Sequence, residues 1–340
     1  MSTIVVQTAL TLEYEAVVNK LYNVQNYTHP VSKTIYKVGT YLSNNNQLQI
    51  IVGRTNQTNI NSAVETERII QHFNPDYIFF VGVAGGLKDV KIGDIVIGSD
   101  VYGYERGKEK EDFLPRPQFG FSSYELEQIA VNYSISQDWE KKSAKFLNIK
   151  FHDRISAYVG TIASGEKVIS STSSELYKFL KKNCSHALAV EMEGLGFLEA
   201  CRPYPLIKSL LIRGISDLVD GKEYSDNEGS QPYASNNATE FLLGLIDFIS
   251  INNENTQLSL RQKLLEIAPK LYPTGLRENG IWINAGGDLS VVNLFTNGKT
   301  QWIEALTLIE KGGGGNIDFM SLIKEMRKDY SNNESLKLLI

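Results

Sequence analysis

Residues 189–217 read AVEMEGLGFLEACRPYPLIKSLLIRGISD, and this stretch decides the fold. Its first apolar residues predict the end of a strand, and the small residues after them predict a helix over Gly194–Cys201. The prolines that follow end this helix, because proline cannot continue a helical ladder. The short apolar run Ile207–Ile215 predicts a strand buried on both faces. Glu193 therefore lies just after one strand, and Asp217 just after another.

Two earlier stretches also bring acids or glycines to the ends of predicted strands. Ile4–Leu10 predicts a first strand, with Glu13 and Glu15 at the start of the helix behind it. Tyr77–Val81 predicts a buried strand that ends in a tight glycine turn, Gly82–Gly86. In open α/β sheets ligands bind beyond the carboxyl ends of strands, so these groups are placed to meet one substrate. On spacing alone, acids at strand and helix ends are also typical caps or solvated surface.

Composition narrows the classes of partner. The chain has 340 residues, 42% of them hydrophobic, which is enough for one large domain and a smaller one. Its 34 Lys and Arg against 39 Asp and Glu give a formal charge of -5, which favours neither nucleic acid nor a membrane as partner. Two cysteines and four scattered histidines predict no metal site, and we expect no cofactor. Without a basic leader or a membrane-spanning run, we expect a cytoplasmic protein.

The rest of the chain up to residue 252 alternates strands and helices. Further strands are predicted over Tyr36–Leu42, Leu48–Val52, Lys91–Gly98 and Arg154–Ser164, and helices over Ser62–Phe73, Ser123–Ile135, Ser173–Lys182 and Asn236–Ile251. Residues 102–121 are polar and read as a long loop beside the site. This pattern predicts an α/β domain over residues 1–252, with a central sheet flanked by helices.

A polar linker over residues 253–257 and a small all-α domain over residues 258–340 follow. The linker residues are free of apolar side chains. Beyond them the pattern is purely helical, for example in Trp302, Leu306 and Ile309, which recur at helical spacing and indicate a core face.

The motifs of the first domain resemble the nucleoside phosphorylase and nucleosidase superfamily, and most of all the methylthioadenosine/S-adenosylhomocysteine nucleosidases. The resemblance covers roughly residues 1–250 and is carried by four stretches, Gly82-Val83-Ala84-Gly85-Gly86, Gly93-Asp94-Ile95-Val96, Val190-Glu191-Met192-Glu193 and Arg213-Gly214-Ile215-Ser216-Asp217. It implies a phosphorylase/hydrolase-like mixed central sheet and a purine nucleoside or nucleotide as substrate. It also implies a homodimer or a larger homo-oligomer.

The resemblance implies a role for each acid in breaking an N-glycosidic bond, a reaction that needs a leaving-group acid, a sugar-binding group and a placed nucleophile. Asp217 would protonate the purine at N7, and Glu193 would hold the ribose hydroxyls with Met192 packed on the sugar. Glu15 would orient the attacking water. Glu13 competes for that task, but the spacing from the first strand favours Glu15.

Further substrate-binding candidates surround these acids. Backbone that a ligand can approach closely comes from the glycine-turn residues Val83, Ala84 and Gly85. The family places a side chain against the base at the positions of Val168 and Ile169. Support for the acids comes from Glu191 and Ser216. Glu191 is expected to point away from Glu193, because successive side chains of a strand alternate.

The resemblance leaves the nucleophile to be decided between water and phosphate. Phosphorylases of this superfamily hold phosphate with arginines and a serine of the glycine turn, whereas Phe80 and Val83 stand near those places here. Phe and Val cannot hold a dianion, which favours hydrolysis. Arg54 keeps phosphorolysis as the alternative, and a nucleoside-binding signalling module without turnover is a third.

Two accessory hypotheses concern the long loop and the last domain. Arg106, Lys108 and Arg116 of the loop are candidates to bind a 5′-phosphate, against the alternative of ordinary solvated charge. Residues 258–340 resemble an effector-associated domain of bacterial conflict systems in three stretches, Leu271-Tyr272-Pro273, Trp302-Ile303-Glu304-Ala305-Leu306 and Tyr330-Ser331-Asn332-Asn333-Glu334-Ser335-Leu336. That resemblance implies an anti-phage effector recruited by a protein partner with a matching domain. The alternative is a helical appendage that stabilises the enzyme.

Overall fold

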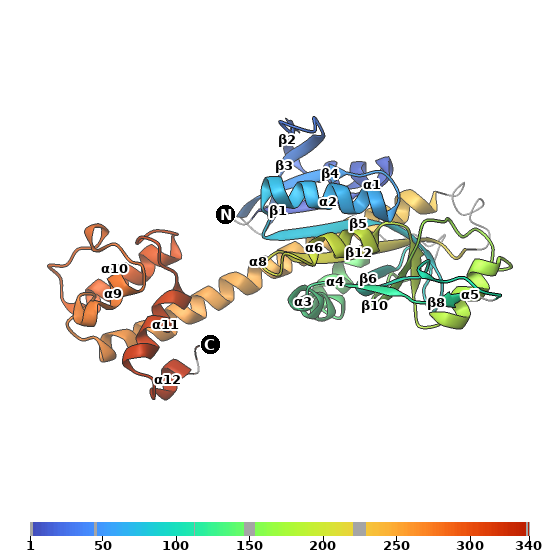
Figure 1. The fold of residues 1–340 in the computed structure, drawn as a ribbon. Coiled ribbons are helices and arrows are strands. Elements are labelled where there is room, and N and C mark those ends of the chain that lie inside the picture. The colour runs from blue at the N-terminus through green and yellow to red at the C-terminus, as the bar shows by residue number, and fades with distance from the viewer. Residues whose placement is uncertain are drawn as a thin grey trace. The chain divides into compact units, whose positions relative to one another are not determined.

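The computed structural model describes residues 3–43, 46–111, 113–145, 154–219, 229–337 and 339 (Figure 1). It divides the chain into two compact units, Met1–Ile249 and Ser250–Ile340. The division falls three residues before the predicted end of the first domain at residue 252.

The first unit alternates strands and helices, as the apolar runs predict. Its strands are β1 (Ile4–Thr8), β2 (Tyr22–Thr28), β3 (Ile35–Ser43), β4 (Asn46–Arg54), β5 (Tyr77–Gly86), β6 (Ile95–Gly103), β7 (Gly107–Lys108), β8 (Leu114–Pro115), β9 (Gln118–Phe121), β10 (Ala157–Ser164), β11 (Ala189–Glu191) and β12 (Lys208–Asp217). Its helices are α1 (Thr11–Val18), α2 (Asn59–Phe73), α3 (Tyr124–Ser134), α4 (Gln137–Ser143), α5 (Glu175–Asn183), α6 (Gly194–Cys201) and the start of α8 (Ser230–Leu271).

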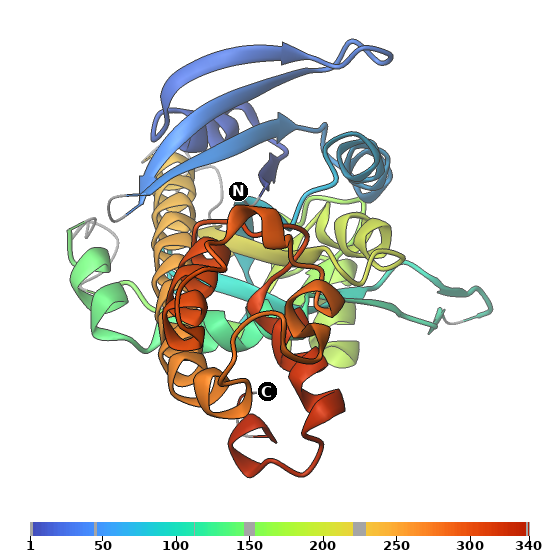
Figure 2. The ribbon, with the colours of Figure 1, turned by 90° about the vertical axis from the view of Figure 1, so that its left-hand side faces the viewer.

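Within the described residues, ten strands form one mixed sheet in the order β11-β10-β6-β12-β5-β1-β4-β3-β2, with β9 paired to β6. The three-residue strand β11 pairs in parallel with β10 and antiparallel with β5. This double pairing closes β11, β10, β6, β12 and β5 into a ring. The long strands β2 and β3 form the opposite edge and are the blue pair at the top of Figure 2.

Two apolar layers cover the two faces of the sheet. Successive side chains of β1 alternate between them, since Ile4 and Val6 pack into one layer and Val5 into the other. The first layer is completed by α1, α3 and α8, and the second by α2 and α6. The predicted α/β class, a central mixed sheet flanked by helices, is confirmed, and α6 has the predicted bounds Gly194–Cys201.

The glycine turn predicted over Gly82–Gly86 is wrong in its geometry, because β5 continues as a strand through these residues to Gly86. The reason is tertiary. Val190 and Ala189 of β11 pair with Gly85 and Gly86. This strand pairing keeps the backbone of the two glycines extended, and it cannot be predicted from the local sequence. The next strand also differs, since β12 reaches Asp217 after a register shift that follows Ile215.

The predicted loop over residues 102–121 is partly strand. β6 extends into it to Gly103, and β9 at its far end pairs antiparallel with β6. Between them β7 and β8 form a two-stranded ribbon. Aromatic residues at Tyr102, Phe119 and Phe121 favour strand here, despite the polar composition of the segment.

The second unit is all-helical, as predicted, and is built around its own apolar cluster. After α8 come α9 (Ile281–Asn284), α10 (Gly298–Glu310), α11 (Phe319–Asp329) and α12 (Glu334–Lys337), with short 3₁₀ turns at Glu278–Gly280 and Leu289–Val291. Trp302 is fully buried and donates from Nε1 to the carbonyl oxygen of Tyr272 at 3.1 Å. This position fits the prediction that Trp302 belongs to a core.

Residues 253–257, which were predicted as a polar linker, are helical in the structure. These residues lie inside α8, which runs without interruption from Ser230 to Leu271. The segment contains no glycine or proline, so nothing in its sequence removes a backbone hydrogen bond from the helix. In the described part of the chain, none of the helices combines the length and the apolar character that crossing a bilayer requires.

Candidate active site

A cavity of about 140 Å³ lies where β1, β5, β11 and β12 reach the same edge of the sheet. Its lining residues come from the chain ends of these strands, from the segment after β4, from the loop after β10 and from the first turn of α8. They are Ala9, Leu10, Glu13, Gln57, Val83, Ala84, Gly85, Lys167, Val168, Ile169, Val190, Glu191, Met192, Glu193, Ser216, Asp217 and Gln231. The sheet thus gathers segments that are up to 222 residues apart in sequence (231 minus 9) around one small space.

Glu13 is held rigidly at the start of α1. Its Oε2 accepts hydrogen bonds from the backbone N–H groups of Ala9 at 2.9 Å and Leu10 at 2.8 Å, and its Oε1 accepts one from Val83 at 2.8 Å. Burial raises the pKa of Glu13, while the charge of Arg213 and these hydrogen bonds oppose that rise. The carboxyl group therefore bridges the end of β1 and the middle of β5.

Arg213 is the cation at the centre of the acids. It is fully buried, and its Nη2 lies 2.6 Å from Glu191 and 3.4 Å from Glu193. Its guanidinium stacks 4.4 Å from the ring centre of Phe80. Burial lowers the pKa of Arg213, but Glu191, Glu193 and Glu13 outweigh that effect and raise it. Nε and Nη1 make no hydrogen bond to any described residue, so this buried guanidinium retains donor capacity.

Gly82 explains how these charges fit beneath β5. A Cβ atom at this position would lie 2.3 Å from Nη1 of Arg213 and 2.5 Å from Oε1 of Glu13. Only a residue without a side chain leaves room for both groups. Gly82 is therefore needed so that the buried side chains of Arg213 and Glu13 can lie against β5.

The two neighbouring acids of β11 and its following turn have separate tasks. Glu191 accepts hydrogen bonds from the N–H groups of Glu193 at 2.9 Å and Gly194 at 2.8 Å, so it caps α6. Glu193 accepts from the N–H of Thr58 at 3.2 Å. Both carboxylates also contact Nη2 of Arg213 and line the cavity, so the expectation that Glu191 points away from Glu193 is wrong, because the extended strand ends at Glu191. Burial, followed by the charge of Glu191, raises the pKa of Glu193, and Arg213 opposes the rise.

The segment before α2 secures Glu193 at a cost in backbone strain. Thr58 has φ of 98°, a conformation that a β-branched residue rarely adopts. Beside it, Asn59 accepts through Oδ1 from the N–H of Gly196 at 2.9 Å and from Oγ of Ser164 at 3.0 Å. Asn59 therefore ties α2 to α6 and to the end of β10. Sequence reasoning missed both residues, because their partners lie more than 100 residues away.

Asp217 faces the cavity from the end of β12. It is 1% exposed, and its carboxylate accepts from Oγ of Ser216 at 3.0 Å and from the N–H of Val219 at 3.0 Å. A Cβ at Gly85 would approach Oδ1 of Asp217 to 3.1 Å, so the glycine backbone of β5 packs closely on this group.

The structure brings most of the predicted site residues to the cavity. Besides Asp217 and Glu193, the lining contains Met192, Val83, Ala84, Gly85, Val168, Ile169, Glu191 and Ser216. Among the described residues no group of three or more His, Cys, Asp or Glu side chains is arranged to hold a metal ion. Val168 is 60% exposed, whereas Ile169 is buried, so only the latter forms a closed wall.

Glu15 is the exception, and its placement is a correction. It is exposed on α1 and does not line the cavity, whereas Glu13 is 2% exposed and does. Two residues along a helix differ by about 200° around its axis, so only one of the two acids can face the sheet. The apolar neighbours Ala16 and Val17 are buried with Glu13, and helical periodicity at these positions was the available signal.

The three loop cations that were candidates for a phosphate site do not line this cavity. Arg106, Lys108 and Arg116 are exposed on the β7–β8 ribbon and its flanks. Of the described residues that line the cavity, Lys167 alone is basic, and it lies 3.7 Å from Glu105 on the exposed side.

Comparison with known proteins places the chain in a family. The family described as the Phosphorylase superfamily matches residues 3–247, and the chain belongs to it. The match ends just before the boundary between the two compact units.

Individual relatives agree with this assignment. The 5′-methylthioadenosine/S-adenosylhomocysteine nucleosidase of Staphylococcus haemolyticus is 25% identical over 217 residues, which cover 63% of this chain and 89% of that protein. The nucleosidase of that name from Neisseria meningitidis, solved with methylthio-immucillin-A, has a TM-score of 0.57 at 22% identity, covering 73% of this chain and 99% of its own. The futalosine hydrolase of Helicobacter pylori has a TM-score of 0.57 at 23% identity, covering 72% and 97%.

Proposed function

We propose that this chain is a nucleosidase, which hydrolyses the N-glycosidic bond of a purine nucleoside or nucleotide and releases the free base. The observation that carries the proposal is the convergence of Glu13, Glu193 and Asp217 on one cavity from three separate segments. Glycosidic cleavage needs an acid for the leaving group, a group for the sugar and a placed nucleophile. Relatives named as nucleosidases support the same reaction class.

The three acids divide the reaction between them. Asp217 assists departure of the base, and Ile169 contributes an apolar part of the cavity wall. Glu193, fixed by Thr58 and Arg213, holds the ribose hydroxyls with Met192 against the sugar. Glu13 takes the place proposed from sequence for Glu15 and orients the attacking water.

Arg213 acts as a positioning residue for this arrangement. Its Nη2 fixes Glu191 and Glu193, while Nη1 lies next to the Gly82 backbone beside Glu13. Arg213 is fully buried and does not itself line the cavity, so it acts on the substrate site through the acids that it holds in place.

The charge around Glu13 favours water over phosphate as nucleophile. Four carboxylates line the cavity against one basic lining residue, Lys167, in the part of the chain that the structure describes. A phosphate dianion beside Glu13 would meet like charge in a desolvated site. Phosphorolysis remains the runner-up.

Chromatography of free base released from a panel of purine nucleosides and nucleotides tests the proposal. We expect base release that is indifferent to added inorganic phosphate. Ribose 1-phosphate as the main sugar product would establish the phosphorylase alternative instead. Saturable nucleoside binding without any released base would establish the alternative of a signalling module.

We also propose that the helical second unit is a docking module, which recruits the nucleosidase as an effector in anti-phage defence through a partner with a matching domain. Its separate core around Trp302 and the absence of this unit from the family match support a role apart from catalysis. Ending the chain at Asn252 should leave base release intact and abolish partner binding. Loss of base release in a folded truncated chain would contradict this.

The superfamily resemblance also supports a homodimer or larger oligomer. Sedimentation equilibrium measures the oligomeric state.

A further inference from the structure

The position of Glu193 and Asp217 restricts where a sugar substituent can leave the cavity. In the proposed function, on which this inference rests, Asp217 faces the base and Glu193 faces the ribose hydroxyls. The remaining sugar substituent, at C5′, must therefore leave on a third side. Two segments bind the acids Glu193 and Glu13 through backbone N–H groups, the segment after β4 through Thr58 and the start of α1 through Leu10. They contribute Gln57 and Leu10 to the lining, so we take them as the walls of that third side.

Gln57 is a polar residue that lines the cavity on this third side. It lies next to Thr58, whose N–H binds Glu193, so the strained backbone at Thr58 fixes Gln57 beside the sugar-binding acid. The carboxamide of Gln57 makes no hydrogen bond to the described residues, although its backbone carbonyl accepts from Asn61. A cavity wall with a free carboxamide suits a hydrogen-bonding substituent better than an apolar one.

Arg54 is a cation that does not line the cavity itself but lies next to residues that do. It is the last residue of β4 and lies opposite Thr8 in the parallel pairing with β1, and the residues that follow Thr8, Ala9 and Leu10, line the cavity. Its Nη1 donates to Oγ1 of Thr11 at 2.8 Å, which anchors the guanidinium beside Leu10.

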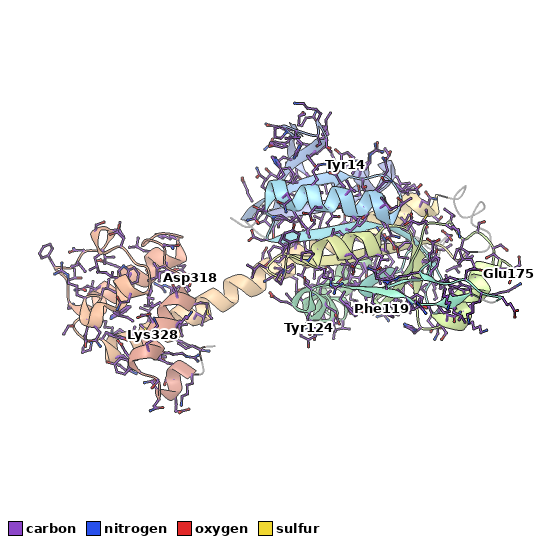
Figure 3. The ribbon with its side chains drawn as sticks, viewed as in Figure 1. Tyr14, Phe119, Tyr124, Glu175, Asp318 and Lys328 are labelled. Carbon is purple, nitrogen blue, oxygen red and sulfur yellow. The ribbon has the colours of Figure 1, made fainter. Side chains whose placement is uncertain are left out.

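The guanidinium of Arg54 is available for an anion. No described carboxylate lies within ion-pair distance of it, and the side chain is exposed. Arg54 is also close enough to Tyr14, labelled in Figure 3, for its charge to lower the pKa of that phenol, against a larger rise from burial. Planar guanidinium groups bind phosphate through paired donors.

We propose that the substrate carries a phosphate group at C5′, which Arg54 binds with help from Gln57 at the mouth of the cavity. The phosphate lies outside the ring of acids, because an anion among the four carboxylates would be repelled. This location replaces the ribbon cations Arg106, Lys108 and Arg116. A free phosphate ion offers the same chemistry at Arg54, so the experiment must separate the two sources.

The experiment compares adenosine, 5′-methylthioadenosine and AMP as probes for the full-length wild type, Arg54→Ala, Arg54→Lys and the matched control Arg116→Ala. We expect kcat/KM of the wild type to be about 10- to 100-fold higher for AMP than for adenosine, the size of a charge-assisted hydrogen bond. Arg54→Ala should remove this preference and change adenosine cleavage less than about 2-fold. Arg54→Lys should retain part of it, and Arg116→Ala should leave it unchanged.

Three outcomes would overturn the inference. Equal use of AMP and adenosine by the wild type would do so, as would an equal loss on both probes in folded Arg54→Ala. Stimulation of adenosine cleavage by inorganic phosphate, with loss of that effect in Arg54→Ala, would assign Arg54 to the nucleophile. If no probe releases base, the proposed function fails separately. Calorimetric binding of AMP and adenosine to the same variants then decides the role of Arg54.

Discussion

Replacing Glu13 and Glu15 separately by glutamine tests which acid serves the nucleophile. Both substitutions remove one negative charge and keep the size of the side chain. At Glu15 the change falls on an exposed position of α1. At Glu13 it falls on a carboxylate that receives three backbone N–H groups through two oxygens.

The geometry gives the expected magnitudes. Glutamine at position 13 offers one oxygen, so its amide nitrogen must face at least one N–H group of Ala9, Leu10 or Val83. One buried donor without an acceptor costs about 1–3 kcal/mol in the free energy of unfolding. Loss of the base should lower kcat by roughly 10² to 10⁴. Glu15→Gln should change stability by less than about 0.5 kcal/mol and kcat by less than about 2-fold.

The assay is chromatographic base release under saturating substrate, with urea unfolding of each variant in parallel. The unfolding curve shows that Glu13→Gln is folded under the conditions of the assay. Wild-type turnover in folded Glu13→Gln, together with a 10²-fold loss in Glu15→Gln, would refute the placement of the nucleophile beside Glu13. It would also imply that the described cavity is not where the reaction occurs.

Three further predictions follow from the same contacts. Gly82→Ala places a methyl group 2.3 Å from Nη1 of Arg213, so it should lower the free energy of unfolding by about 1–3 kcal/mol and reduce base release, measured by urea unfolding and chromatography. Because burial raises the pKa of Glu13 and Glu193 above 4.5, the folded chain binds more protons than the unfolded chain. The free energy of unfolding should therefore fall as pH rises from about 4.5 through the raised pKa values of these two acids. Urea unfolding at a series of pH values measures it, and a rise across that window would contradict the prediction. Trp302→Ala should cost the second unit about 3–5 kcal/mol and leave base release unchanged, as near-ultraviolet circular dichroism and the base-release assay would report.

The sequence predicts elements wherever local periodicity and packing agree. Ile207–Ile215 is apolar on both faces and forms most of β12, and the small residues of Gly194–Cys201 form α6 with the predicted bounds. The same reasoning fails at Gly82–Gly86, where glycine is conventionally a turn residue. There the decisive partners are β11 and the buried Arg213, which no local pattern reveals.

The candidate site shows the same division between local and distant causes. The sequence motifs identify Glu193 and Asp217 as lining residues because each lies at the end of a strand or just after it. The choice between Glu13 and Glu15 needed the rotation of α1 against the sheet. The contribution of Thr58 depends on a backbone conformation unusual for its residue type, so its side-chain chemistry gives no signal.

Burial raises the pKa of two carboxyl groups in one cavity, Glu13 and Glu193, and the charge of the neighbouring acids adds to the rise at Glu193. Glu13, Glu191 and Glu193 face a single described guanidinium, and burial disfavours every uncompensated negative charge. The pKa of both Glu13 and Glu193 is raised, so proton uptake by one of them relieves the charge on the other. A base must be ionised, whereas a group that holds sugar hydroxyls can serve in its protonated form, since a carboxylic acid both donates and accepts. In the proposed mechanism Glu193 can therefore serve in either protonation state, whereas Glu13 must be ionised when it acts as the base.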